Sequence, residues 1–410
     1  MFCDATMRLG HTSVVLPWTQ VLADPQLVCR SIQGGDIIRI ESPGENSAVE
    51  RTLIEMGAEV RGHQRCSGTA QAVGSDAAEP CCLSDGLRRA AATECGRRQA
   101  AAHSQDSVSY GGEFGRIEDS SLWYAGFCST LKLLQTSCGG AKSVRWMNAP
   151  EDIALMFDKA KCQAMFQSAG IPVPQILGSV SSYEELRLLM RQKNVSRVFL
   201  KLPHSSSASG IIALQTNGRQ VIAQTSAELV QRGTESILYN SLQVRRYTDE
   251  RQVALLVDTL GAMGLHVEQW MPKAGLAGRS FDLRVVVIAG NVRHVVVRTS
   301  RTPMTNLHLG NERGDVDRVR RAMPAKQWGQ AMQACEDAAK CLPESLYMGV
   351  DLLFTPGFRT HSIMEVNAFG DLLPNVVHGA ETTYEAEVAA AAAQQERQVG
   401  SGSDLPGRSA

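Results

Sequence analysis

Three oxygen-bearing side chains near the C-terminal end of the sequence are the strongest candidates for chemistry. Asp351 lies within the apolar run 349–353, and Glu365 and Asn367 lie two residues apart in the run 363–367. Because alternate residues of a strand share a face, Glu365 and Asn367 should point the same way, and a hairpin would bring Asp351 beside them. Two carboxylates and a carboxamide suit Mg²⁺ that bridges substrate phosphates. A solvated polar face is the alternative, but the apolar neighbours predict a buried hairpin, in which unpaired carboxylates would be costly.

Residues that could bind phosphate lie earlier in the chain. Lys201 ends an apolar run, and a loop rich in hydroxyls follows it at once. The loop residues that could face phosphate are Ser205, Ser206, Ser207, Ser209 and Gly210. Backbone N–H groups and hydroxyls in such a loop can turn toward phosphate oxygens, and a lysine at its base would neutralise them. Lys159 is a second candidate; the alternatives are a plain surface loop and a solvated helix charge.

The segment Glu268–Met271 suits the recognition of a nucleobase. It follows an apolar approach at Leu265 and Val267. Glu268 can accept a hydrogen bond from the amino group of adenine, and the backbone near Trp270 can bond to the edge of the ring.

Several arginines follow this segment. Arg284 shares a strand face with Asp282, Arg298 and Arg301 lie beyond the next turn, and the segment around Asn306 comes next. Arginines that converge beside a phosphate and Mg²⁺ site suit phosphoryl transfer and acyl-phosphate chemistry, because they aim donors where charge develops.

Short strands and amphipathic helices must position these residues. Strands 14–16 and 37–40 and helices 20–31 and 49–56 give a βαβα order, which predicts an open α/β domain. One helix is expected to begin near Asn148, which can act as its N-cap, with Pro150 in the first turn, and to continue to Gly170. The other expected elements are helix 122–135, strands 197–200 and 211–214, helix 250–263, hairpin 281–299, helix 328–341 and hairpin 350–367.

Length and composition limit the classes of protein that the chain can belong to. Its 410 residues, 43% hydrophobic and 20% charged, predict a globular protein of two or three domains. A net charge of −1 and an aromatic content of 5% favour neither a nucleic acid nor an anionic membrane as partner. No secretory signal or membrane-length apolar run is found, and the eleven cysteines form no CxxC pair, which predicts a cytoplasmic protein with reduced thiols.

Residues 62–107 interrupt the α/β order. They contain too few large apolar residues to offset the entropy of ordering, which predicts a flexible insertion. The four cysteines within it, Cys66, Cys81, Cys82 and Cys95, fit no common zinc-ligand spacing, so solvated thiols are favoured over a zinc site. We also expect a flexible tail over residues 1–12 and a frayed helix and flexible tail over 385–410.

From Asn148 to Asn375 the order of these motifs resembles the ATP-grasp superfamily, and within it the RimK-like branch of ATP-dependent carboxylate–amine ligases. The matching elements are Asp158-Lys159, Gly170–Pro174, Lys201 with its loop to Gly210, Glu268–Met271, Asp282–Arg284, Asn306–Gly310, Asp351 and Glu365–Asn367. The resemblance implies an α/β (α+β) ATP-grasp fold behind an N-terminal open α/β domain over residues 13–145. The N-lobe with its phosphate flap would cover 146–270, and the C-lobe with its Mg²⁺ site would cover 271–384.

The resemblance also implies roles for the matching residues. Lys159 and Lys201 would hold the phosphates of ATP under a mobile flap over 205–210, while Glu268, Trp270, Met271 and Asp282 would bind the rest of the nucleotide. Asp351, Glu365 and Asn367 would hold two Mg²⁺ ions, with Mn²⁺ as the alternative metal. Arg284 and Arg298 would face the acyl phosphate and the tetrahedral intermediate, and Asn306 would lie near the phosphates. The family reaction forms an amide or thioester from a carboxylate and releases ADP.

Two departures restrict what the resemblance transfers. Serines replace the two or three glycines that many relatives carry in the flap, and Ala368–Asn375 replaces the Ser-Pro-Gly common in RimK relatives. Specificity for peptide or glutamate is therefore not carried over, and the expected substrates are small-molecule or peptide carboxylates and amines. A homodimer is expected only by analogy with relatives. A kinase of the same fold and a nucleotide-binding or scaffold protein without turnover are the alternative functions.

Overall fold

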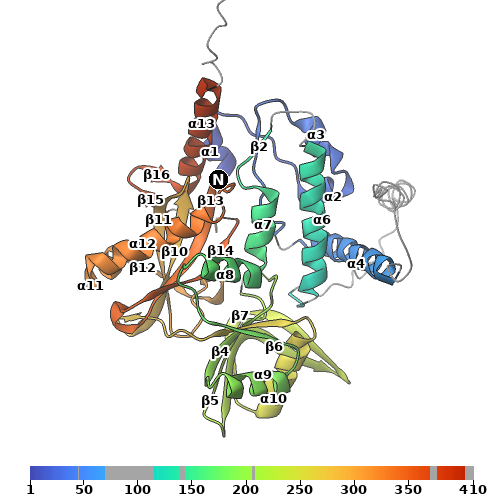
Figure 1. Cartoon of the computed structure of the whole chain (residues 1–410), viewed down its shortest axis with the longest axis vertical. Coiled ribbons are helices and arrows are strands. Elements are labelled where there is room, and N and C mark those ends of the chain that lie inside the picture. Colours follow the sequence, from blue (N-terminus) through green and yellow to red (C-terminus); the bar gives the residue numbers. More distant parts are fainter. Residues whose placement is uncertain are drawn as a thin grey trace, which may run out of the picture.

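The computed structural model describes residues 1–44, 46–69, 115–117, 119–138, 144–205, 208–369 and 376–401. It has three parts, two next to each other in the upper half of Figure 1 and the third below them. The first part, which we call the N-terminal body, consists of helices around a small parallel sheet. The other two parts, which we call the N-lobe and the C-lobe, are each built on a six-stranded antiparallel sheet. The mixed helix-and-sheet class expected from the sequence is confirmed.

The N-terminal body contains α2 (Trp18–Ala23), α3 (Gln26–Ser31), β1 (Ile37–Ile38), α4 (Ser47–Thr69), α6 (Ser120–Cys138) and β2 (Arg145–Trp146). β1 and β2 pair in parallel, as an open α/β arrangement requires. The predicted strand 14–16 is wrong, because this segment lies outside every sheet and Val14 is 76% exposed. The predicted helix 20–31 divides at Asp24-Pro25, since proline has no N–H with which to continue the first helix.

Both expected tails are partly helical. Residues 2–8 form α1 (Phe2–Arg8), which packs against α13 (Thr383–Ser401) through the contact between Phe2 and Tyr384. The prediction of a flexible tail is therefore wrong for residues 2–8, whereas the helix expected from about residue 385 is present as α13. Residues 402–410 lie outside the described part of the chain. The expected insertion begins later than predicted, because residues 62–69 continue α4; residues 70–107, with three of the four cysteines, lie outside the described residues.

Two glycines allow α4 and α6 to cross at very short distance. A Cβ on Gly57 would lie 1.9 Å from the carbonyl oxygen of Leu122, and a Cβ on Gly126 would lie 1.9 Å from that of Leu53. The contact is reciprocal, so each helix backbone fills the space that a side chain on the other would need. This crossing fixes α6, whose first turns reach the N-lobe.

Replacing Gly126 with alanine should lower the free energy of unfolding by about 3 kcal/mol, because the added methyl group must push two helix backbones apart. Denaturant titration of purified protein measures this change. Gly62→Ala is the matched control, since Gly62 is an exposed helical glycine with nothing within 4 Å of the added atom. That control should stabilise the protein by about 0.5–1 kcal/mol. Equal effects of the two substitutions would contradict the tight crossing.

The N-lobe sheet has the strand order β3-β8-β4-β5-β6-β7. Its strands are β3 (Ile176–Val180), β4 (Arg197–Lys201), β5 (Ile212–Thr216), β6 (Val221–Arg232), β7 (Glu235–Tyr247) and β8 (Leu265–Gln269). Alternate residues such as Val198, Leu200 and Val267 bury one face under α9 (Tyr183–Gln192) and α10 (Glu250–Gly261). The opposite face is turned toward the C-lobe.

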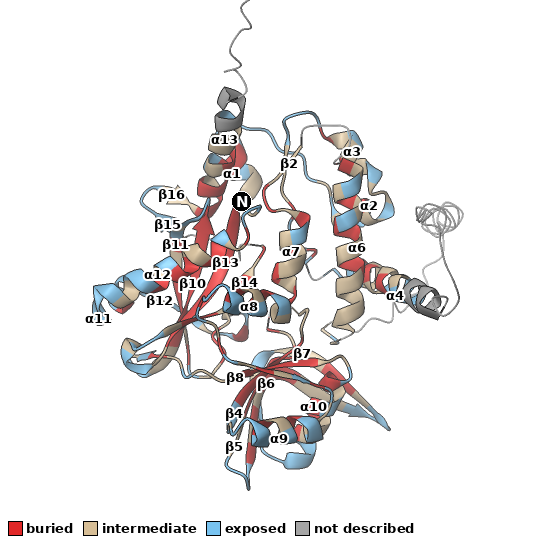
Figure 2. Cartoon of the chain, in the orientation of Figure 1, coloured by how far each residue is buried: buried red, intermediate tan, exposed pale blue. Residues whose placement is uncertain are grey.

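The C-lobe sheet has the order β12-β11-β10-β13-β14, with β9 paired to β10. Its strands are β9 (Gly275–Leu276), β10 (Arg279–Ile288), β11 (Asn291–Ser300), β12 (Glu312–Gly314), β13 (Tyr347–Phe354) and β14 (His361–Asn367). The expected hairpins 281–299 and 350–367 are confirmed. Figure 2 shows the central strands β10 and β13 almost wholly buried, whereas the edge strands β7 and β12 are mostly intermediate or exposed.

The two faces of the C-lobe sheet differ. One face packs under α12 (Ala325–Lys340) and shares a continuous apolar core with the N-terminal body. On the other face, α13 covers the end that carries Val286, Ile288 and Tyr347. The rest of that face carries charged residues and faces the N-lobe.

The predicted helix 150–170 is two helices, α7 (Pro150–Phe157) and α8 (Lys159–Ser168). Asp158 is not helical, with φ −91° and ψ 89°, and its carboxylate caps α8 by accepting from the amide of Lys161. Asn148 does not cap α7 as predicted; its side-chain amide donates instead to the carbonyl oxygens of Tyr347 and Ala368, each at 2.9 Å. The break places Lys159 at the first position of α8.

The remaining short elements are η1 (Leu307–Leu309), α11 (Val316–Ala322), η2 (Pro356–Phe358), β15 (Val377–His378) and β16 (Glu381–Thr382). None of the helices in the described ranges combines the length and apolar character needed to span a membrane.

Candidate active site

A cavity between the two sheets brings the predicted lysines and carboxylates together. α8 forms one wall, β4 and β8 of the N-lobe form the second, and β14 of the C-lobe forms the third. Its lining residues are Met156, Lys159, Cys162, Gln163, Phe166, Val173, Lys201, Glu268, Ile363, Met364, Glu365 and Val366.

The N-lobe places Lys201 and Glu268 on its inner face. Lys201 pairs in register with His266, and Glu268 pairs with Phe199, so all four side chains leave the sheet on the same side. The Lys201 ammonium lies 2.5 Å from the Glu268 carboxylate, and both residues are at most 5% exposed. Burial alone would lower the pKa of Lys201, but the charges of Glu268, Glu365 and Asp351 raise it, so Lys201 is a cation.

Gln163 and His266 complete this wall. The Gln163 side chain donates to the Pro174 carbonyl at 3.0 Å and to Glu268 at 3.4 Å, and its oxygen lies 2.7 Å from Nε2 of His266. Burial, followed by the charge of Lys201, lowers the pKa of His266 to about 4, so the ring is neutral at pH 7. A neutral ring can donate to Gln163, which orients the amide nitrogen toward Glu268.

Lys159 connects the two lobes. Its ammonium donates to the carbonyl oxygen of Ser205 and lies 3.4 Å from the Glu365 carboxylate of β14. The Lys159 amide donates to the carbonyl oxygen of Pro203 at 3.1 Å. Of the phosphate-binding residues proposed from the sequence, Lys159 and Lys201 thus line one cavity, and Ser205 contacts Lys159.

One face of the C-lobe sheet carries six of the residues predicted from that part of the sequence, whereas Asn306 lies outside the strands, next to η1. The six residues are Asp282, Arg284, Arg298, Asp351, Glu365 and Asn367. The register pairs Asp282 with Arg298, Arg284 with Asp351, and Asp351 with Glu365, and directly paired residues share a face.

A register shift at Asp351/Leu352 explains how β14 serves both the site and the core. Ile363 pairs with Leu352 and faces the apolar core, whereas Glu365 pairs with Asp351 and faces the cavity. The extra residue, Met364, reverses the alternation between them, as a β-bulge does. The amide nitrogen of Asn367 donates to the Gly349 carbonyl at 3.3 Å, which leaves its oxygen as the atom available to a metal.

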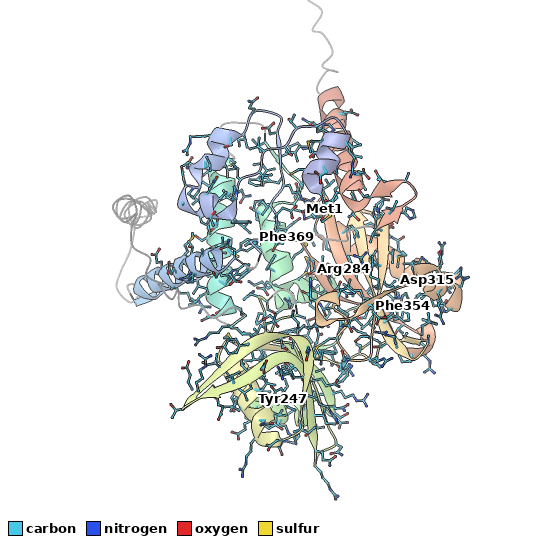
Figure 3. All side chains as sticks on the ribbon, turned by 180° about the vertical axis from the view of Figure 1, so that it is seen from behind. Met1, Tyr247, Arg284, Asp315, Phe354 and Phe369 are labelled. Atoms are coloured by element: carbon cyan, nitrogen blue, oxygen red, sulfur yellow. The ribbon has the colours of Figure 1, made fainter. Side chains whose placement is uncertain are left out.

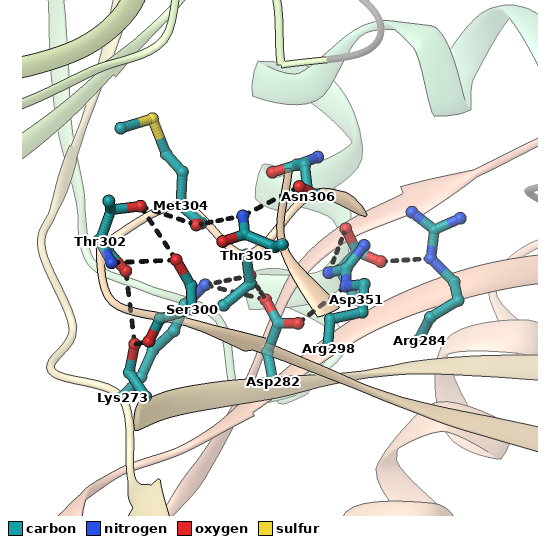
Figure 4. A network of polar contacts seen from close by, with 12 residues as sticks. Lys273, Asp282, Arg284, Arg298, Ser300, Thr302, Met304, Thr305, Asn306 and Asp351 are labelled. Atoms are coloured by element: carbon teal, nitrogen blue, oxygen red, sulfur yellow. Dashed lines mark hydrogen bonds and ion pairs between the residues drawn. The ribbon is translucent and has the colours of Figure 1, made fainter. Parts of the chain in front are cut away.

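A chain of buried charges crosses this face (Figure 4). Lys273 donates to Asp282 at 2.8 Å, Asp282 accepts from Arg298 at 2.8 Å, and Arg298 reaches Asp351 at 3.1 Å. The other oxygen of Asp351 accepts from Arg284. Figure 3 labels Arg284 on the C-lobe, seen from behind, with the N-lobe that carries Tyr247 below it.

These neighbours fix the charges of the network. Burial would raise the pKa of Asp351, but Arg284 and Arg298 outweigh it and lower the pKa. Asp282 behaves in the same way beside Arg298 and Lys273. Because Asp282 accepts from Lys273, Thr305 and Arg298, it orients Arg298 in this structure, and a direct contact with nucleotide stays a prediction.

The other predicted residues are not among those that line the cavity. Trp270 packs against Phe199 with ring centroids 5.3 Å apart, and its amide donates to the Arg197 carbonyl. Within the segment Glu268–Met271, the next backbone amide after it is that of Met271. Gly210 adopts a left-handed φ of +65° where a Cβ would meet Leu202 at 3.0 Å. Asn306 directly precedes η1, and its carbonyl accepts from Asn311 at 2.9 Å. Ser209 is half-buried, and Ser206 and Ser207 lie outside the described residues.

Sequence reasoning missed four residues of the site, Gln163, His266, Lys273 and Thr305. Two of them had a detectable signal. Gln163 follows Lys159 by one helical turn, and His266 precedes Glu268 by two strand positions, so each shares a face with a predicted residue. Lys273 and Thr305 lie in loops, where no periodicity indicates the direction of a side chain.

Comparison with known proteins gives structural neighbours only. No family model and no curated protein matches the chain. Among solved structures, D-alanine–D-alanine ligase from Bacillus anthracis, complexed with ATP, is 14% identical with a TM-score of 0.43, over 68% of this chain and 78% of that chain. The ATP-grasp ligase PsnB, complexed with minimal precursor, Mg and ADP, is 15% identical with a TM-score of 0.41, over 89% of this chain and 100% of that chain. N5-carboxyaminoimidazole ribonucleotide synthetase in its ADP complex is 14% identical with a TM-score of 0.42, over 64% of this chain and 57% of that chain.

Proposed function

We propose that this chain is an ATP-dependent, ADP-forming ligase of the ATP-grasp type, which joins a carboxylate to an amine or thiol through an acyl phosphate. The observation that carries the proposal is the convergence on one cavity of Lys159, Lys201 and Glu268 with the carboxylate of Glu365. These residues come from four separate elements, and the order of their motifs is the one that resembles the family.

The residues present fit a bound Mg²⁺. Glu365 lines the cavity, and Asn367 lies on the same face of β14 with its side-chain oxygen turned away from its own hydrogen bond to Gly349. Asp351 lies beside Glu365, with its carboxylate paired to Arg284 and Arg298. All three carry the oxygen atoms that this ion prefers. Within the described residues no cluster of three His, Cys, Asp or Glu side chains offers a competing site. When bound, the ion would act as a Lewis acid toward the phosphates.

The chain's own residues would then position the reactants. Lys159 and Lys201 would neutralise the phosphates, and Glu268 with the Met271 amide would hold adenine. A carboxylate oxygen of the substrate attacks the γ-phosphorus, and the bond to ADP breaks. The amine nitrogen then attacks the acyl carbon, and phosphate leaves as the amide forms. Arg284 and Arg298 would stabilise the negative charge that develops in both steps.

Calorimetric titration of ATP in the presence of Mg²⁺ tests the proposal. Wild-type protein should bind, and binding should weaken without Mg²⁺ and in the variant Glu365→Ala/Asn367→Ala. The control Glu184→Ala/Asn291→Ala changes the same residue types at exposed positions and should bind like wild type. Absence of binding to folded wild-type protein would contradict the proposal.

Hydroxylamine distinguishes a ligase from a kinase of the same fold. In a screen of carboxylic acids with MgATP, a ligase should yield a hydroxamate and ADP, because hydroxylamine captures the acyl phosphate. ADP formation with hydroxyl-bearing substrates and no hydroxamate would instead support the kinase.

A further inference from the structure

Helix α6 belongs to the N-terminal body, yet its first residues are attached to the N-lobe. Just before it, residues 115–117 lie along the outer edge of β7, where the Ile117 amide donates to Leu238 at 2.8 Å and the Asn240 amide donates to Gly115 at 2.6 Å. The helix is therefore held at one end by the N-lobe sheet and further along by its crossing with α4.

Tyr124, in the second turn of α6, stacks on the ring of His204. The ring centroids are 3.8 Å apart and the planes are within 4° of parallel, and the Tyr124 hydroxyl donates to the Ala154 carbonyl at 2.9 Å. Burial lowers the pKa of His204 to about 4, so the stacked ring is neutral at pH 7.

The residues on both sides of His204 hold Lys159. The carbonyl oxygen of Pro203 accepts from the Lys159 amide, and that of Ser205 accepts from the Lys159 ammonium. A displacement of His204 would move both acceptors, and with them the lysine at the phosphate end of the cavity.

We propose that Tyr124 is a positioning residue for Lys159, acting through His204, and that the N-terminal body thereby sets the affinity of the site for the phosphates of the nucleotide. This inference deepens the proposed function and rests on it. It assigns a task to the ring of Tyr124 rather than to its hydroxyl, because the ring makes the stack and the hydroxyl contacts α7.

Calorimetry with MgATP and with adenosine separates positioning from general loss of structure. Tyr124→Leu should weaken MgATP binding about tenfold and leave adenosine affinity unchanged, since Lys159 would contact phosphate only. Tyr124→Phe should bind MgATP within twofold of wild type. Tyr183→Leu, which removes a tyrosine from α9 on the far side of the N-lobe, is the matched control and should bind like wild type.

A second variant keeps the test independent of the folding of the first. His204→Leu should reproduce the selective loss, and Tyr124→Leu/His204→Leu should bind no more weakly than the weaker single variant, because both remove one contact. Melting temperatures establish which variants are folded. Unchanged MgATP affinity of folded Tyr124→Leu, or equal losses for MgATP and adenosine, would overturn the inference. Failure of wild-type protein to bind MgATP would instead remove the proposed function on which it rests.

Discussion

Replacing Asp282 with asparagine should lower the free energy of unfolding by about 3–5 kcal/mol, because it removes one partner from a buried ionic network. Asp282 is 3% exposed and accepts from three donors, two of them cationic. The network holds three positive side chains and two carboxylates, a net charge of +1, and the substitution raises this to +2. Urea titration at neutral pH measures the loss.

A compensating variant tests whether charge is the cause. Asp282→Asn/Lys273→Met restores the net charge to +1 and should be more stable than Asp282→Asn alone. Asp337→Asn is the surface control, since Asp337 accepts from Lys340 and Gln333 at the exposed side of α12, and it should change stability by less than about 0.5 kcal/mol. Strictly additive losses in the double variant would contradict the explanation.

The pH dependence gives an independent signature of the same carboxylate. The pKa of Asp282 is lowered in the folded protein, so its contribution to stability is present above its unfolded pKa of 3.8 and is lost as the pH falls below that value. The difference in stability between wild type and Asp282→Asn should therefore shrink in acid.

Replacing Lys201 with methionine should weaken MgATP binding roughly 30- to 150-fold, because a charge-assisted contact to phosphate contributes about 2–3 kcal/mol. Lys201 is 5% exposed, so methionine can fill the same space without its charge. Calorimetric titration measures the affinity.

This substitution leaves Glu268 buried without its cation, so a second variant is needed. Burial already raises the pKa of Glu268, and in Lys201→Met/Glu268→Gln a neutral amide replaces the unpaired carboxylate. The double variant should be the more stable of the two and should still bind MgATP weakly. Lys161→Met is the control, since its side chain is 71% exposed and pairs with Asp158. Comparable losses in Lys161→Met and Lys201→Met would contradict the assignment of Lys201.

The C-lobe was the most predictable part of the molecule. Its hairpins follow from apolar runs separated by short turns, and the two-residue period correctly places Glu365 and Asn367 on one face. The period does not predict the bulge at Met364, because a bulge depends on how two strands fit together. The convergence of Lys159 with Glu365 also required the tertiary fold, since the residues are 206 positions apart.

Sequence patterns failed where a distant partner decides the local structure. The alanine-rich segment from about residue 385 suggested a frayed end, but α13 is held by a buried ion pair between Glu387 and Arg39. The Arg39 guanidinium in turn stacks on the rings of Phe2 and Tyr347. The run 150–170 has continuous helical character, and only the capping role of Asp158 indicates where it divides. Val14 and Val15 favour a strand by residue type, but none of the strands in the described part of the chain pairs with them.

The face of the C-lobe sheet that carries the candidate site is divided along the length of its strands. On β10, Asp282 and Arg284 belong to the buried charged network, whereas Val286 and Ile288, on the same side of the same strand, lie under α13. The charged residues that would determine reactivity are thus separated, along the same strand, from the apolar residues that pack the sheet against α13. Evolution can alter the first group for a new substrate while the second continues to specify the fold.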